Sequence, residues 1–187
     1  MLNENGIIYK TRFTNTLLLQ NKLWPNDTEV SLHMIPQTDD FNHQQIAYEK
    51  YKYVFAKILQ NSIFVNDDSK EIKSISKFNN QIVDFFTKPV DQIVGVCLLK
   101  KLNSIAGEYL HVETVEIESW QGENLKFIIS ENSTEYELMV ADSKKNSWVY
   151  DASPRFNNFG NKNLTWNDLG FTISDKNDSF RIIKGGL

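Results

Sequence analysis

Two long segments of the chain carry apolar residues at helical spacing. Over about residues 40–60, an apolar stripe faces one side and polar side chains face the other. Over 87–107, apolar residues surround most of the girth, so this helix is expected to be buried in the core. The stripe residues are Ile46, Ala47, Tyr51, Val54, Phe55 and Ile58 in the first helix, and Val90, Ile93, Val94, Cys97, Leu98, Leu102 and Ile105 in the second.

The starts of both predicted helices carry local signals. Asp39 or Asp40 is expected to cap the first helix, because a carboxylate there accepts from the free N–H groups of the first turn. Pro89 suits the first helical position of the second helix, where an N–H would have no partner. Asp91 follows in the first turn, where the helix dipole favours a negative charge.

Short apolar or alternating runs predict the strands. In the run 28–35, Val30, Leu32 and Met34 share one face and polar residues the other, which indicates a half-buried strand. Proline, asparagine and aspartate at 25–27 predict a turn before it. Over the first 119 residues, the expected strands are 6–19, 28–35, 62–65, 81–86 and 110–119.

The stretches 110–119, 124–130 and 134–142 are joined by short polar turns, so they predict an antiparallel meander. The alternation slips between Val112 and Val115, which indicates a β-bulge near Thr114.

The order of these elements predicts the fold class. From residue 28 to 119 it is βαββαβ, the order of ferredoxin-like folds. We therefore expect an α+β protein, with an antiparallel sheet, two main helices on one face and the C-terminal meander. Residues 1–150 are expected to form this domain, and 151–187 an irregular or β extension packed on it. This fold class hosts many functions and implies none.

Composition narrows the class of protein. The chain has 187 residues, 41% of them hydrophobic, and no apolar run approaches the ~20 residues of a membrane helix. The first ten residues lack a basic segment followed by an apolar one, so no signal peptide is expected. Cys97 is the single cysteine, which excludes an internal disulfide and fits a reducing cytoplasm.

Acidic residues gather in one part of the chain. Residues 108–142 hold nine acidic side chains and one lysine, within a chain of net charge −4. Strand alternation puts Glu116, Glu118, Glu135 and Glu137 on the face opposite the apolar residues. A plain solvated face is the simplest interpretation. One alternative is a surface for a basic protein partner or a decoy of nucleic-acid charge. A divalent-cation site serving a metal-dependent hydrolase is the third possibility.

Other candidate chemistry is sparse. His33, His43 and His111 have no metal-ligand spacing, so no metal or cofactor is expected. Cys97 lies on an apolar stripe and is expected to be a small buried hydrophobe. Lys50, Tyr53 and Lys57 share one side of the first helix, where basic and aromatic groups could hold RNA. A solvated helix face whose tyrosines pack on a neighbouring element is the simpler interpretation. The acidic total and the presence of only three arginines weigh against nucleic acid.

The stretches 38–65 and 88–127 resemble uncharacterised small proteins of T4-like marine bacteriophages. The markers are Pro89-Val90-Asp91-Gln92, Lys101-Leu102-Asn103 and the turn from Glu116 to Glu123. The resemblance implies phage origin and a host-cytoplasmic or virion location, with no catalytic residue. We therefore expect a phage accessory protein that acts by binding a protein partner through the acidic face. An RNA- or nucleotide-binding regulator is the alternative.

Overall fold

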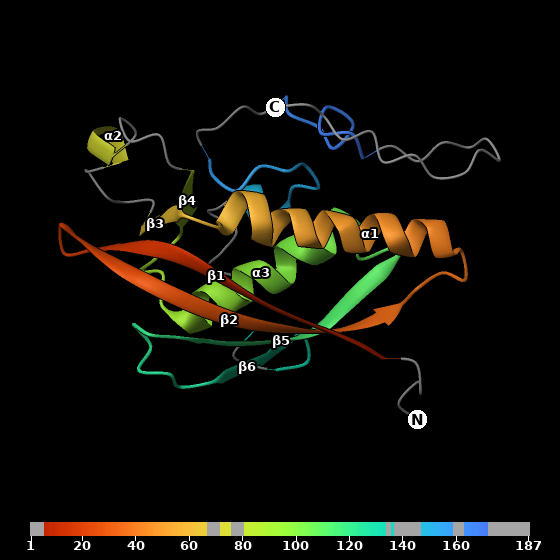
Figure 1. Cartoon of the computed structure of the whole chain (residues 1–187), viewed down its shortest axis with the longest axis horizontal. Helices are drawn as coiled ribbons and strands as arrows, with labels where there is room; N and C mark the ends of the chain where they lie inside the picture. The colour runs from red at the N-terminus through yellow and green to blue at the C-terminus, as the bar shows by residue number, and fades with distance from the viewer. Residues whose placement is uncertain are drawn as a thin grey trace.

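A mixed sheet of six strands carries two long helices on one face (Figure 1). This arrangement belongs to a computed structural model that describes residues 6–66, 72–75, 81–133, 136, 147–158 and 163–171. The α+β class predicted from the sequence is confirmed. The strands are β1 (Ile7–Leu19), β2 (Lys22–Pro36), β3 (Ser62–Asn66), β4 (Ile82–Phe85), β5 (Leu110–Ser119) and β6 (Phe127–Ser130); the helices are α1 (Phe41–Tyr53), α2 (Ile72–Ile75) and α3 (Asp91–Ala106).

The first two strands form a long hairpin around a two-residue turn. Gln20 and Asn21 make this turn with φ angles of 51° and 65°, as a type I′ turn requires. The turn predicted at 25–27 is wrong, because Pro25 lies inside β2 and pairs with Thr16. The pairing of β5 with β2 reaches only to Thr28, so Pro25 occupies an edge position, where proline is tolerated.

The ferredoxin-like arrangement is also wrong, although all of its predicted elements form. The sheet order is β4-β3-β1-β2-β5-β6, so the first strand of the chain lies in the middle of the sheet. β3 runs parallel to both β1 and β4. The segment 67–81 between β3 and β4 is long enough for the crossover that parallel neighbours need. The sheet is therefore mixed, where the sequence predicted an antiparallel one.

The bulge predicted near Thr114 is confirmed. The register of β2 and β5 shifts where His33 pairs with Thr114 and Met34 with Val112, so Glu113 is the extra residue. β5 and β6 pair antiparallel, as the first two strands of the predicted meander should. The third, 134–142, lies outside the described residues except for Tyr136, whose backbone is helical.

The helix starts follow the predicted caps with one shift. The Asp40 carboxylate accepts a hydrogen bond of 2.9 Å from the Asn42 N–H, and α1 continues into a π-helical turn, η1 (Val54–Leu59). α3 begins at Asp91, because the extended backbone of Val90 makes that residue the cap. Pro89 therefore lies just outside the helix and not at its first position.

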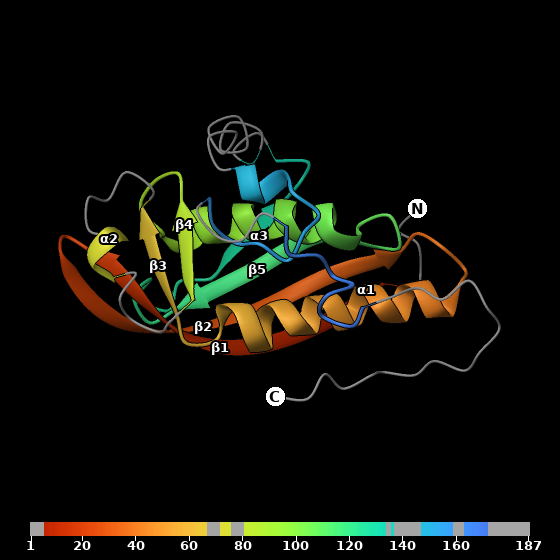
Figure 2. The same cartoon turned by 90° about the horizontal axis from the view of Figure 1, so that it is seen from above.

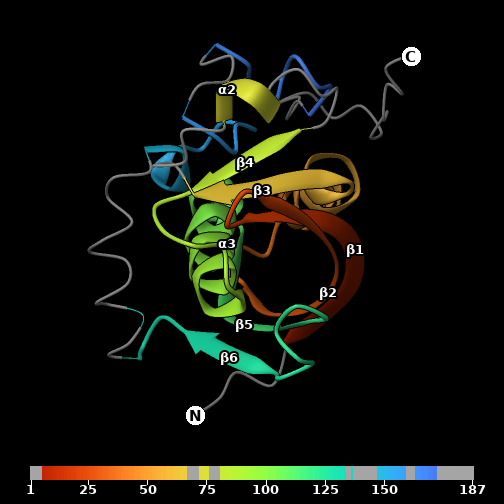
Figure 3. The same cartoon turned by 90° about the vertical axis from the view of Figure 1, so that its left-hand side faces the viewer.

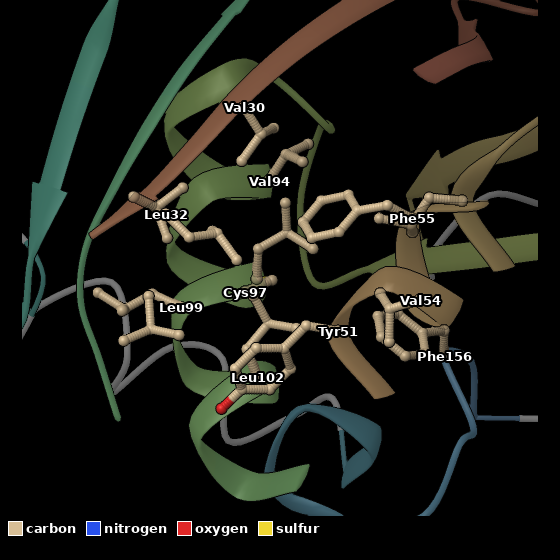
Figure 4. Packing of buried hydrophobic residues seen from close by; sticks show 14 of the residues in the cluster. Val30, Leu32, Tyr51, Val54, Phe55, Val94, Cys97, Leu99, Leu102 and Phe156 are labelled. Carbon is tan, nitrogen blue, oxygen red and sulfur yellow. The ribbon is translucent and has the colours of Figure 1, made fainter. Parts of the chain in front are cut away.

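The core fills the space between the helices and the concave face of the sheet. Seen end-on, the sheet curls around α3, from β4 and β3 through β1 and β2 to β5 and β6 (Figure 3). From above, α1 and α3 run next to each other over the strands (Figure 2). Cys97 and Leu99 of α3 are buried in one cluster with Leu32 of β2 and Tyr51 of α1 (Figure 4). The Tyr51 hydroxyl donates to the carbonyl of Leu110 at 2.6 Å, which ties α1 to β5.

The β4 edge of the sheet is covered by side chains from a segment much later in the chain. η2 (Ser147–Tyr150), a short 3-10 helix, places the Trp148 indole N–H 2.8 Å from the Asp84 carbonyl. The Asn157 amide donates to the Ile82 carbonyl at 2.9 Å. These two carbonyls alternate along β4, so the later segment blocks further strand pairing at this edge.

No helix among the described residues is long and apolar enough to cross a membrane.

We predict that Cys97 is inert in the folded protein. Its side chain is completely buried, and burial raises the pKa of the thiol, with the nearby charge of Asp84 adding to the rise. Because the thiolate is the reactive form, a thiol reagent should label Cys97 only after denaturation. Stoichiometric labelling of native protein at a rate near that of the unfolded chain would contradict the burial.

Candidate functional site

The predicted acidic face is the solvent-facing side of β5. Glu116 and Glu118 lie there, opposite the buried Val115 and Ile117, as the alternation predicted. Glu135 and Glu137 lie outside the described residues. The structure therefore shows two of the four predicted carboxylates on one face.

Basic groups accompany both of these carboxylates. Glu116 lies 2.8 Å from His33 Nε2 and 3.5 Å from Lys126 Nζ, and Lys126 is also 3.9 Å from Glu118. Burial raises the pKa of Glu116, but its bonds to His33 and Lys126 outweigh this and leave the pKa lowered. Within the described residues, both carboxylates thus share the neighbouring Lys126, and a basic partner here stays a prediction.

The double substitution Glu116→Gln and Glu118→Gln tests that partner. Because the ion pairs are partly exposed, the free energy of unfolding should change by no more than about 1 kcal/mol. If a basic protein binds this face, the variant should associate more slowly and with a flatter salt dependence. Capture of basic proteins from a cell lysate at stepped salt measures this. Identical capture by variant and wild type at every salt would leave the face as solvated surface.

The basic and aromatic side of the first helix meets a distant part of the chain. Lys50 places its ammonium 5.5 Å from the ring centre of Trp166. Tyr53 contacts Trp166 and Phe171 edge to face, with ring centres 6.1 and 5.5 Å apart. Lys57, the third predicted residue, is exposed on η1 and does not line this site. Two of the three residues predicted for RNA binding are therefore brought together with a new pair of aromatic rings.

These side chains border a hollow of about 410 Å³, which we call the Trp166 hollow; it is lined by Lys50, Thr165, Trp166, Asn167 and Phe171. Lys50 is the one ionisable side chain among these lining residues. Burial lowers the pKa of Lys50, and the nearby Glu108 partly opposes this. The hollow is therefore lined by one partly desolvated cation, two polar side chains, the partly buried Phe171 and the ring of Trp166, which is 8% exposed.

A tight local fold presents Trp166 to α1. The Asp168 carboxylate accepts from the Thr165 N–H and hydroxyl at 2.8 and 2.7 Å. Gly170 has a φ of 84°, which a residue with a side chain rarely adopts, and the Phe171 N–H then returns to the Trp166 carbonyl at 2.9 Å. The Trp166 indole N–H donates to the Ala152 carbonyl at 2.6 Å. Trp166 is thus fixed from both its backbone and its ring.

Sequence reasoning missed Trp166 and Phe171, because 153–176 shows no hydrophobic period. The available signal was local: a threonine followed three residues later by an aspartate is typical of a capped turn. The tryptophan inside that turn is flanked by polar residues, which makes it a candidate contact residue.

Comparisons with known proteins support the fold and assign no function. No family model and no curated protein matches the chain. The structure of the uncharacterized protein WS1659 from Wolinella succinogenes is similar, with a TM-score of 0.51 and 12% identity over 68% of this chain and 98% of that one. The 6-pyruvoyltetrahydropterin synthase of Plasmodium vivax, solved as a catalytic-residue mutant, gives a TM-score of 0.42 and 14% identity over 69% and 98%. At such identities the first likeness shows a shared fold alone.

Three histidines form separate pairs with carboxylates. His33 contacts Glu116, His43 lies 2.8 Å from Asp40, and His111 lies 3.2 Å from Glu131. Among the residues that the structure describes, no three side chains of the metal-binding types come together. The predicted alternative of a metal-dependent hydrolase therefore gains no site from this part of the chain.

Lys101 is a charged group in the core. Its side chain on α3 is fully buried, and its ammonium donates to the carbonyls of Trp148, Asp151 and Ser153 at 2.9, 2.5 and 2.8 Å. Burial lowers the pKa of Lys101 to about 7, while the charge of Asp151 opposes this and that of Arg155 adds to it. Lys101 thus binds the segment that covers β4.

Asp91 is a second buried ionisable group, at the start of α3. Its carboxylate accepts from the Ser119 hydroxyl at 2.8 and 3.0 Å. A Cβ at Gly122 would lie 2.1 Å from its Oδ2 atom, so the 119–122 turn closes directly over it. Burial raises the pKa of Asp91, although the bonds from Ser119 oppose the rise.

The raised pKa predicts how stability depends on pH at this position. Between the unfolded value of 3.8 and the raised folded value, the folded chain binds more protons than the unfolded one. Asp91 therefore contributes more stability as the pH falls through this window. Wild type should gain stability relative to Asp91→Asn when urea unfolding is repeated from neutral pH down to about pH 4. A constant or opposite difference would contradict the assigned shift.

Proposed function

We propose that this protein binds a small anionic ligand with a planar ring, of about mononucleotide size, in the Trp166 hollow. The observation that carries the proposal is the Lys50 ammonium held over the Trp166 ring at the border of the hollow. A phosphate or carboxylate can draw the ammonium away from the ring and pair with it. The planar part of the ligand can then pack on Trp166 and Phe171.

The size and composition of the hollow favour a single small ligand. Its volume of about 410 Å³ falls within the range of small-molecule sites. One cation suits one anionic group, and Lys57, which an RNA strand could also use, lies apart from the hollow. The net charge of −4 further disfavours a long nucleic acid. We therefore favour binding of a nucleotide-like molecule over binding of RNA.

The proposal is one of binding without chemistry at the hollow. A catalytic site usually combines groups whose environments push their pKa values apart, such as an acid and a base. The described lining residues supply one ionisable group, and Thr165 and Asn167 supply hydrogen bonds only. The phage accessory role stays a prediction from resemblance.

Isothermal titration with three probes tests the proposal. Adenosine 5′-monophosphate carries both ring and charge, adenosine the ring alone, and ribose 5-phosphate the charge alone. We expect the monophosphate to bind most tightly, because it alone uses both features of the hollow. No measurable binding of any probe at millimolar concentration would contradict the proposal.

Matched lysine variants locate the binding. Lys50→Gln should weaken monophosphate binding about tenfold or more, since a bond to a charged group is lost, and should leave adenosine binding nearly unchanged. Lys52→Gln is the control: it removes the same charge two residues away, where the lysine contacts Glu49 and Tyr48. Equal effects of the two substitutions would show general electrostatics and overturn the assignment to the hollow.

A further inference from the structure

Three consecutive carbonyls connect the interior of the protein to the Trp166 hollow. The carbonyls of Asp151 and Ser153 accept from the Lys101 ammonium at 2.5 and 2.8 Å. The carbonyl between them, of Ala152, accepts from the Trp166 indole N–H at 2.6 Å. Residues 151–153 are therefore held by α3 and hold the ring of the hollow.

Lys101 is itself firmly placed. Its three N–H donors have three carbonyl partners, the third being that of Trp148 at 2.9 Å. Its ammonium also lies 5.1 Å from the ring centre of Phe156. Burying a charge costs free energy unless the charge is paired or fully hydrogen-bonded. An apolar side chain at position 101 could fill the same core volume without this cost. A role beyond filling space would account for the lysine.

We propose that Lys101 is a positioning residue for the Trp166 hollow, which fixes residues 151–153 so that Ala152 holds the Trp166 ring in place to receive a ligand. The identity of the ligand rests on the proposed function. The chain of hydrogen bonds from Lys101 through residues 151–153 to the Trp166 indole does not. Among the described residues, no hydrogen bond or cation–π contact joins Lys101 to a residue lining the hollow, so it acts through the segment and the indole bond. Asp151 and Arg155 are the charged groups that face it.

A graded series at position 101 tests the linkage in the free protein. Lysine offers three donors, Lys101→Gln two and Lys101→Met none. The Trp166 indole N–H signal in a ¹⁵N-resolved NMR spectrum should lose hydrogen-exchange protection in that order. The Gln variant keeps the test valid if the Met variant does not fold. Unchanged protection of the Trp166 indole in a folded variant would overturn the positioning role, whether or not any ligand binds.

A control variant separates positioning from stability. The Ser104 hydroxyl of α3 lies 2.9 Å from the Lys100 carbonyl of its own helix and 3.1 Å from the Val149 carbonyl, so its proton is shared between α3 and the same segment, away from Ala152. Ser104→Ala should lower the melting temperature without changing the Trp166 indole signal or affinity. Equal loss of indole protection in Ser104→Ala and Lys101→Gln would reduce Lys101 to general support of the segment.

A double-mutant cycle tests the route to the ligand. Trp166→Phe keeps a ring but removes the indole donor, so it should weaken adenosine 5′-monophosphate binding, and Lys101→Gln should weaken it to a similar degree, about tenfold. Because both substitutions act through the bond between Trp166 and the Ala152 carbonyl, their effects should not add. The double variant should bind the ligand no more weakly than whichever single variant has the lower affinity. Additive losses would contradict the route. Absence of binding in wild type would defeat the proposed function, while the indole protection would still decide the positioning role.

Discussion

Leu98→Asp should abolish the cooperative unfolding transition. Leu98 lies on α3 with 2% of its surface exposed, in a helix that contacts the sheet on one side and α1 on the other. An aspartate there would carry an unpaired charge into the packed core, with an expected loss above about 4 kcal/mol. Total stability of a domain is about 5–15 kcal/mol, so little would remain.

Thermal and urea unfolding followed by circular dichroism measure this loss. Leu98→Met is the matched control, because it keeps the volume and should cost less than about 1.5 kcal/mol. A melt of Leu98→Asp within a few degrees of wild type would mean that α3 does not form the centre of the core.

Trp148→Ala should be the second most damaging substitution. The ring is fully buried between Phe85 and Phe156, with ring centres 6.0 and 5.1 Å away. Its loss leaves a cavity and removes the donor to the Asp84 carbonyl at the edge of the sheet. A loss of about 3–5 kcal/mol is expected.

The neighbouring Tyr150→Ala provides the comparison for Trp148→Ala. Tyr150 belongs to the same short helix and is 38% exposed, so its loss should cost about 1 kcal/mol or less. Both variants are measured by urea unfolding at constant protein concentration. Similar losses in the two would contradict the packing of Trp148 in the main core.

The fold could be predicted as far as its signals are local. The stripe around Cys97 and Leu98 predicted a buried helix, and the slip near Thr114 predicted a bulge. Strand neighbours depend on contacts far apart in the sequence, so the central place of β1 and the parallel pairing of β3 had no local signal. Strands that follow each other in the chain commonly pair as an antiparallel hairpin. β3 and β4 instead pair in parallel, and the chain between them passes through α2.

The candidate site divides in the same way. Lys50 and Tyr53 could be named from the face of one helix, but Trp166, which contacts both, comes from a segment far later in the chain. For the acidic face, the sequence identified the carboxylates but not the basic side chains that lie beside them. Counting charges along 108–142 cannot reveal that His33, from another strand, lies 2.8 Å from Glu116.

The most direct test of ligand binding in the Trp166 hollow uses the four tryptophan indole signals of the protein. Trp24 is exposed on β2, Trp120 is exposed in the turn after β5, and Trp148 is fully buried, so these three serve as internal controls. During an NMR titration with adenosine 5′-monophosphate, we expect a saturable shift of the Trp166 indole signal while the other three stay in place. A spectrum in which Trp166 does not move, or in which Trp24 or Trp120 moves instead, would contradict this expectation.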